Sequence, residues 1–201
     1  MMSTILFLSL LAALLELDTT YAFQFLVSRP IIAGPIFGLA TGDILAGIQV
    51  GVFAELLCAD VSPLGGIIPP SGVIASVVPL ALHHMGIELY FGFFIGIIAA
   101  ILYSYIDTYL RKTRFTWMVY VETKIAKTPY AVLHVLGTSL LLSFLVTFVF
   151  VSLAIWISMW VLAALFPYLN FHLHLAFQLA YMAVPWIGLA TFIPIFRLKT
   201  R

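Results

Sequence analysis

Charged side chains are scarce in this sequence of 201 residues, of which 8% are Asp, Glu, Lys or Arg and 64% are hydrophobic. Soluble domains carry about 25% charged residues, so the composition excludes a soluble protein and indicates an integral membrane protein. Nine basic and eight acidic residues give a net charge of +1. Since no broad positive surface exists to attract phosphates, we expect no nucleic-acid partner.

Cysteine is nearly absent as well, because Cys58 is alone, and this excludes a disulfide framework and a cysteine-rich zinc site. The pairs His83–His84 and His172/His174 do not have the spacing of a structural zinc site. The sequence also lacks a GxxxxGK[ST] phosphate loop, a GxSxG elbow and an HExxH motif. We therefore expect no metal, no cofactor and no catalytic residue on this chain.

Apolar segments fill most of the chain. A bilayer core needs about 20 apolar residues per helix, which allows roughly five to seven crossings or re-entrant pieces here. The sequence therefore predicts an all-α, polytopic membrane protein, with residues 1–201 as one transmembrane domain. Ile5 to Leu15 is interpreted as the first membrane segment. A signal peptide would begin with lysine or arginine, and none precedes this stretch.

Helix breakers are concentrated in the N-terminal 80 residues and predict broken helices there. Gly42–Asp43 interrupts the apolar run 30–59, and a glycine followed by an aspartate can end one helix and cap the next. The run 63–79 has too many prolines and glycines for one spanning helix, although Ser71 can cap a short helix toward Leu82. Irregular backbone at membrane depth is tolerated only inside protein or beside a wet cavity.

A basic stretch in the second half predicts the topology. Residues 87–106 are expected to span the membrane, with Gly92 and Gly96 permitting close helix contact. Residues 107–128 hold five of the nine basic residues and are interpreted as a cytoplasmic loop whose aromatic residues suggest a helix along the headgroups. The basic C-terminus is predicted to be cytoplasmic too, after two crossings by residues 130–166 and 175–196.

Acidic residues within apolar surroundings cost about 2.5 to 3.5 kcal/mol each on insertion scales and need an explanation. Asp43 is interpreted first as a helix cap. Glu55 has no capping position and is interpreted as functional; it shares one helix face with Gly47 and Gly51, at spacings of four.

Broken helices with a proline-rich loop are typical of a transporter binding site. A sugar is a suitable ligand, because its hydroxyls need acceptors and amides and its ring needs an aromatic face. The candidate acceptors are Glu55, Asp60 and Asp18, and the candidate amide is Gln24. Apart from Glu55, an interfacial or solvated position is an equal interpretation for these residues.

An ordered set of motif residues extends over positions 17–82. It consists of Asp18, Gln24, Ser28-Arg29-Pro30, Gly34, Gly38, Gly42-Asp43, Gly47, Gly51, Glu55-Leu56, Pro63, Gly65 and Pro69-Pro70. This set resembles the N-terminal signature of the IIC membrane subunit of the mannose/fructose/sorbose-family sugar phosphotransferase system. Later segments match only loosely.

The resemblance implies a sugar permease that works with a second membrane subunit, IID, and with cytoplasmic IIA and IIB phosphocarriers. It implies an oligomer in the bacterial inner membrane, where a hexose moves inward and is phosphorylated from a phosphohistidine on IIB. By motif position, Gln24, Glu55 and the loop from Asp60 to Pro70 belong to the sugar site. The basic segment, through Arg111, Lys112 and Arg114, is expected to contact anionic lipid or a phosphocarrier.

Family members usually continue past the segment 184–196 with further helices, so this chain is expected to be shorter than usual at its C-terminus. A non-transporting regulatory or scaffold subunit is therefore an alternative function. A proton-coupled carrier in which Glu55 titrates is a weaker alternative.

Overall fold

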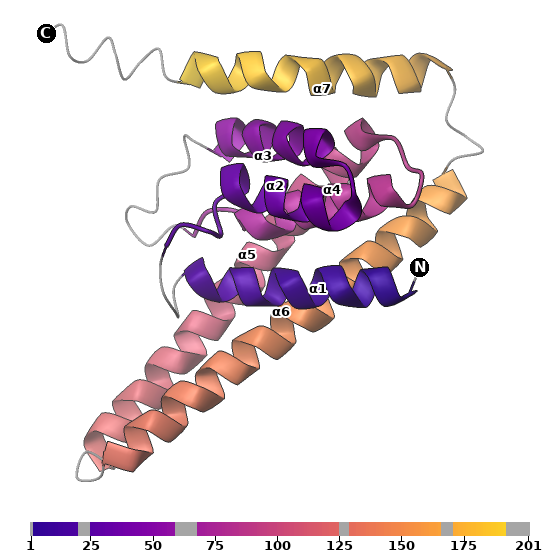
Figure 1. Cartoon of the computed structure of the whole chain (residues 1–201). Helices are drawn as coiled ribbons and strands as arrows, with labels where there is room; N and C mark the ends of the chain where they lie inside the picture. Colours follow the sequence, from indigo (N-terminus) through magenta and orange to yellow (C-terminus); the bar gives the residue numbers. More distant parts are fainter. Residues whose placement is uncertain (1, 20–24, 59–67, 125–128, 166–170, 192–201) are drawn as a thin grey trace, which may run out of the picture.

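The computed structural model of the chain describes residues 2–19, 25–58, 68–124, 129–165 and 171–191. These residues form seven α-helices, a short 3₁₀ turn and no strand, as Figure 1 shows, which confirms the all-α fold. The elements are α1 (Met2–Glu16), η1 (Leu17–Thr19), α2 (Pro30–Thr41), α3 (Ile44–Cys58), α4 (Gly72–His84), α5 (Leu89–Lys124), α6 (Pro129–Leu165) and α7 (Phe171–Thr191).

Long and short helices have different places in the bundle. Within the described residues, four stretches are long and apolar enough to cross a membrane: Met2–Thr19, Leu89–Val119, His134–Leu165 and Phe171–Thr191. The short helices α2, α3 and α4 lie between α1 and α7 in Figure 1, and α5 and α6 run obliquely past them to a shared tip. The predicted broken helices of the N-terminal half are therefore confirmed.

The break between α2 and α3 lies at the predicted position. Gly42 has a φ of 88°, in the left-handed region that glycine adopts without a steric penalty. Asp43 then caps α3, because its Oδ1 accepts a hydrogen bond of 3.0 Å from the Ala46 amide. The expectation that Asp43 is a helix cap is confirmed.

Glycine residues allow the backbones of α2 and α3 to touch. A Cβ added to Gly47 would lie 2.6 Å from the Gly34 carbonyl oxygen and 2.7 Å from the Gly38 Cα. Gly34 meets Gly51 in the same way, one turn along. Glycine at spacings of four on both helices produces this close fit, and the side chain of Glu55 lies on the same face as Gly47 and Gly51.

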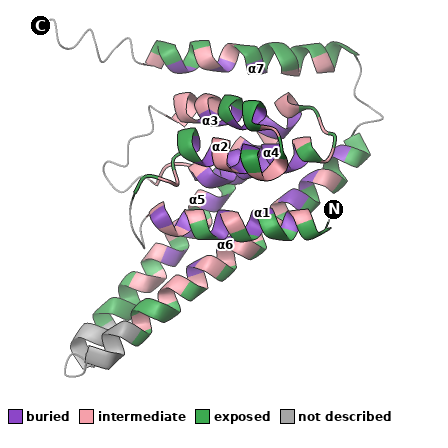
Figure 2. Cartoon of the chain, viewed as in Figure 1, coloured by how far each residue is buried: buried purple, intermediate pink, exposed green. Residues whose placement is uncertain are grey.

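Helix α4 is the buried centre of the bundle, coloured mostly purple in Figure 2. Every residue from Val73 to Leu82 is buried. Ser71 caps this helix, as expected, by accepting from the Ile74 amide at 3.3 Å. Gly92 and Gly96 of α5 admit the backbone and ring of Pro79, which confirms the close contact expected of that glycine pair.

The interpretation of residues 107–128 as a loop is wrong for the part that the structure describes. α5 continues as one helix of 36 residues to Lys124, about 54 Å at 1.5 Å per residue. No glycine or proline follows Gly96 in α5, and Arg111 pairs with Asp107 at 2.7 Å across one turn, so nothing stops the helix at the charged residues. Residues 125–128 lie outside the described residues, and the cytoplasmic side of the segment stays a prediction.

His172 and His174 lie in the first turn of α7, and Tyr90 Oη lies 3.0 Å from His174 Nδ1. The ring of Phe91, also on α5, packs against the same imidazole. His174 is therefore held by two residues of α5. Helix α6 spans 37 residues without a break.

Substitution of Gly47 by alanine tests the backbone contact of α2 and α3. We expect it to lower the free energy of unfolding by about 1–3 kcal/mol, because the added methyl group meets main-chain atoms that cannot rotate away. Gly137→Ala in α6 is the matched control: among the described residues, no atom outside its own stretch of helix lies within 4 Å of its added Cβ. Thermal unfolding in detergent measures both, and equal effects of the two substitutions would contradict the close fit.

Candidate functional site

Four chain segments meet at the end of the bundle where α1 finishes, on the left in Figure 1. They are the last turn of α1 with η1, the start of α2, the end of α3 and the start of α4. The start of α4 lies directly on the start of α2, because a Cβ on Gly72 would touch the Pro30 ring and lie 2.9 Å from the Ser28 carbonyl oxygen. The motif residues around Arg29 and Pro70 are therefore neighbours in space.

Glu55 ties the end of α3 to the start of α2. Its Oε1 lies 2.9 Å from Arg29 Nη1, and its Oε2 accepts from the Ile31 amide at 3.4 Å. The Ile31 amide is one of the α2 donors left without an intrahelical partner, so Glu55 acts as a cap from another helix. A carboxylate has about four acceptor positions, and the side chain of Glu55 is 25% exposed. Glu55 can therefore still accept hydrogen bonds from a ligand.

Asp18 has a structural task that the sequence did not predict. Its Oδ1 accepts from the Phe25 amide at 2.7 Å, and its Oδ2 accepts from the Ser28 amide at 3.3 Å. The residue is buried, at 8% exposure. Asp18 thus holds the segment that leads into α2, next to the other candidate residues.

Two of the predicted site residues, Gln24 and Asp60, lie outside the described residues. Pro69 and Pro70 lie at the edge of the site, half-buried and directly before the cap of α4. Phe25, the aromatic residue that follows Gln24, is 71% exposed.

Helix ends and carboxylates together set the electrostatics of this site. The N-termini of α2 and α4 bring partial positive charge and free amide donors, while Asp18 and Glu55 bring negative charge and acceptors. An arrangement with both donors and acceptors fits a neutral ligand rich in hydroxyl groups better than an ion of either sign.

Glu16 is the site residue that sequence analysis missed. It lies at the end of α1, is 5% exposed, and its Oε2 accepts from the Ser71 hydroxyl at 2.7 Å. Its signal in the sequence is the same as that of Glu55, an acid beside an apolar run.

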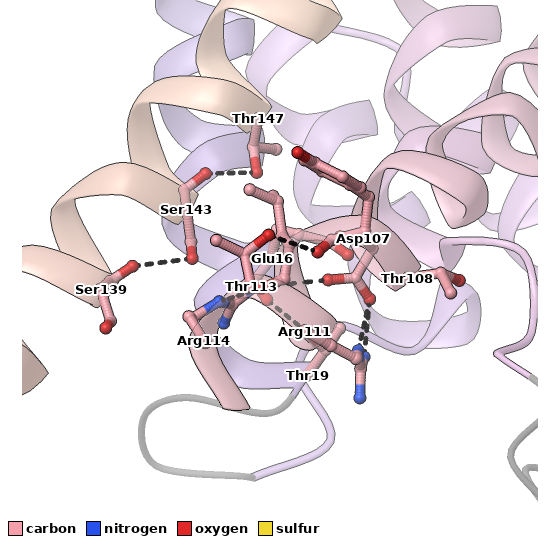
Figure 3. Close-up of polar contacts among 12 residues, drawn as sticks. Glu16, Thr19, Asp107, Thr108, Arg111, Thr113, Arg114, Ser139, Ser143 and Thr147 are labelled. Carbon is pink, nitrogen blue, oxygen red and sulfur yellow. Dashed lines mark hydrogen bonds and ion pairs between the residues drawn. The ribbon is translucent and has the colours of Figure 1, made fainter. Parts of the chain in front are cut away.

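A group of charges on α5 lies beside Glu16, as Figure 3 shows. Asp107 is 6% exposed and pairs with Arg111 at 2.7 Å and with Arg114 at 3.8 Å. Two of the three basic residues expected to face lipid or a phosphocarrier therefore bind an acid of their own helix. Lys112, in contrast, is exposed.

The opposite end of the α2–α3 pair is joined to α4. Asp43 Oδ2 lies 3.3 Å from His83 Nε2, and the Thr41 carbonyl oxygen lies 3.1 Å from His84 Nδ1. The hydrogen bond from the Ala46 amide, aided by His83, holds the pKa of Asp43 below its ordinary value. Asp43 therefore acts as a charged acceptor that fastens the α2–α3 turn.

Comparison with known proteins gives the family. A family model described as "PTS system sorbose-specific IIC component" matches residues 2–200. The chain belongs to this family. The resemblance suggested by the motif residues is thus confirmed, and membership places the chain among the membrane components of sugar phosphotransferase systems.

A curated relative matches a shorter stretch of the IIC chain. The "Putative N-acetylgalactosamine permease IIC component 2" of Escherichia coli (strain K12) is 40% identical over 53 residues, which are 26% of this chain. The matched stretch spans 40% of the length of that relative.

A solved structure supports the fold. A chain described as "Structure of membrane protein" aligns with a TM-score of 0.75 over 98% of this chain and 83% of its own length. Its sequence identity of 17% makes this a likeness of fold alone.

Replacing Asp18 by alanine tests its task as a loop holder. Loss of both acceptors leaves two amides unpaired, so we expect the free energy of unfolding to fall by about 1–3 kcal/mol. Hydrogen exchange at Phe25 and Ser28 should become faster. Asp18→Asn is the control, because its remaining carbonyl oxygen can still accept one of the two amides. Unchanged exchange in the alanine variant would contradict this role.

Proposed function

We propose that this chain is the sugar-binding and translocating IIC subunit of a phosphoenolpyruvate-dependent phosphotransferase system of the mannose family. It takes up a hexose and moves it inward across the bacterial inner membrane, where a separate IIB subunit phosphorylates it. The observation that carries the proposal is the meeting of the family's motif residues at one end of three short helices, where Glu55 of α3 binds the start of α2 and the start of α4 packs on Pro30 of the same turn.

In this proposal each candidate residue has a stated task. Glu55 accepts hydrogen bonds from sugar hydroxyls. Gln24, which directly precedes Phe25, and Asp60, which follows the end of α3, add further polar contacts. Pro69 and Pro70 form one wall, because proline lacks an N–H group and leaves only carbonyl acceptors toward the ligand. Asp18 shapes the site by holding the segment before α2 and does not itself need to touch the sugar.

The chemistry of phosphoryl transfer belongs to partners in this proposal. The chain works as one domain, residues 1–201, in an oligomer with the membrane subunit IID, and IIA and IIB deliver the phosphoryl group. Of Arg111, Lys112 and Arg114, Lys112 is the exposed one and would attract an anionic carrier or lipid headgroup, with the C-terminus on the same, cytoplasmic side.

Uptake into vesicles tests this function. Vesicles contain this chain with or without IID and phosphorylated IIB, and radiolabelled glucose, mannose, fructose, sorbose and N-acetylgalactosamine are supplied outside. We expect internal sugar phosphate that depends on all components. No uptake by a folded, assembled complex would contradict transport and favour a regulatory or scaffold role. Uptake of free sugar that follows a proton gradient would favour a proton-coupled carrier.

Substitution of Glu55 by glutamine tests its contact with sugar. We expect the affinity for the transported hexose to fall roughly tenfold, because a hydrogen bond to a charged acceptor is stronger than one to a neutral amide. Isothermal titration in detergent measures this affinity.

Arg29→Gln is the matched control for Glu55→Gln. It removes the same ion pair, whose exposed arginine contributes little to stability, and leaves the carboxylate in place. If both variants lose affinity equally, the ion pair and not the carboxylate is the determinant. An unchanged affinity in Glu55→Gln removes Glu55 from the sugar site.

A further inference from the structure

A buried carboxyl group outside the predicted site residues reaches the edge of that site. Glu16 ends α1, and its Oε2 accepts from the hydroxyl of Ser71, 55 positions later in the chain, at 2.7 Å. Both residues are buried, at 5% and 8% exposure. Water therefore competes little for this hydrogen bond, so that it is stronger than an exposed one.

Ser71 links Glu16 to the backbone of α4. Its hydroxyl donates to Glu16 and accepts from the Ile74 amide at 3.3 Å, while its carbonyl oxygen accepts from the Ala75 amide at 3.0 Å. The orientation of the cap is thus determined from both sides. Because α4 is buried along its length, its first turn has little freedom to adjust.

The two residues before Ser71 cannot donate backbone hydrogen bonds. Pro69 and Pro70 directly precede Ser71 and carry no N–H group. Ser71 is the next residue along the chain with donor groups, and its hydroxyl is bound by Glu16. The place where the Ser71 hydroxyl is bound therefore helps to fix the position of the double proline.

The last turn of α1 holds both segments that border the proposed sugar site. Asp18 binds the amides of the segment before α2, and Glu16 binds the residue that begins α4. The two segments also touch each other, because Gly72 packs on Pro30. Figure 3 shows Glu16 beside Asp107, which is paired with the arginines of its own helix.

We propose that Glu16 is a positioning residue for the sugar site: through Ser71 it places the Pro69–Pro70 segment against the start of α2, without touching the sugar. This inference rests on the proposed function for its consequence and on the Glu16–Ser71 contact for its mechanism. The acceptor oxygen, and not the negative charge, is what the role requires.

A pair of variants of similar size separates the acceptor from the packing. Glu16→Gln keeps a carbonyl oxygen for the Ser71 hydroxyl, whereas Glu16→Leu fills the space without an acceptor. With the hexose that gives the highest uptake, we expect Glu16→Leu to raise KM roughly tenfold with little change in the maximal rate. Glu16→Gln should stay within about twofold of the wild-type KM.

Hydrogen exchange gives a readout that does not depend on transport. In Glu16→Leu, the Ile74 amide and its neighbours in residues 71–75 should exchange faster, because the Ser71 cap is released on one side. In Glu16→Gln they should stay protected. Ser9→Ala is the control on the same face of α1: Ser9 is fully buried, and in the described part of the chain its hydroxyl has no hydrogen-bond partner.

Different failures are distinguishable in this design. Normal KM and normal exchange in Glu16→Leu overturn the inference, and equal damage in both Glu16 variants overturns the role of the acceptor. If no sugar is transported, the proposed function fails, but exchange at residues 71–75 still decides whether Glu16 positions the segment. If Glu16→Leu does not fold, Ser71→Ala breaks the same contact from its other end, and Ser71→Thr retains the hydroxyl. Unchanged exchange in Ser71→Ala also overturns the inference.

Discussion

Supplying hydrogen-bond partners to the starts of short helices is the constraint on which this structure depends. Three short helices begin against other segments of the bundle, and each start leaves backbone N–H groups that need an acceptor, which lipid does not offer. Side chains supply the missing hydrogen-bond partners. Glu55 accepts from the start of α2, Asp43 caps α3, and Ser71 caps α4 with Glu16 behind it. Three acids of this apolar sequence, Glu16, Asp43 and Glu55, therefore act at the starts of short helices.

The same acids define the place where a ligand can bind. A helix that begins inside the bundle offers donors, and the carboxylate that caps it keeps unused acceptor positions. Around Glu55 these two conditions hold together, beside the start of α2 and the neighbouring start of α4. Structure and proposed function thus share residues, which is why Arg29→Gln is needed to separate the two roles of Glu55.

Local signals in the sequence predicted the broken half of the fold well. The turn at Gly42–Asp43 and the cap at Ser71 depend on residues within a few positions of one another. The close contact of Gly92 and Gly96 is visible in the sequence as a pair of small residues four positions apart, although its partner, Pro79, is on another helix. The continuation of α5 through the basic segment was not predicted, because charge indicates a membrane boundary but does not end a helix. Only tertiary packing reveals that Glu16 meets Ser71, since no spacing rule joins residues 55 positions apart.

The contact between α2 and α3 has a further consequence. Because glycine lines both surfaces, the contact has almost no rotatable side chains to immobilise, and its cost in side-chain conformational entropy is close to zero. It also admits a single register, since a shift of one residue would drive a side chain into main-chain atoms. The two helices therefore pack as one unit in a fixed register, with Glu55 at one end of it and Asp43 at the other.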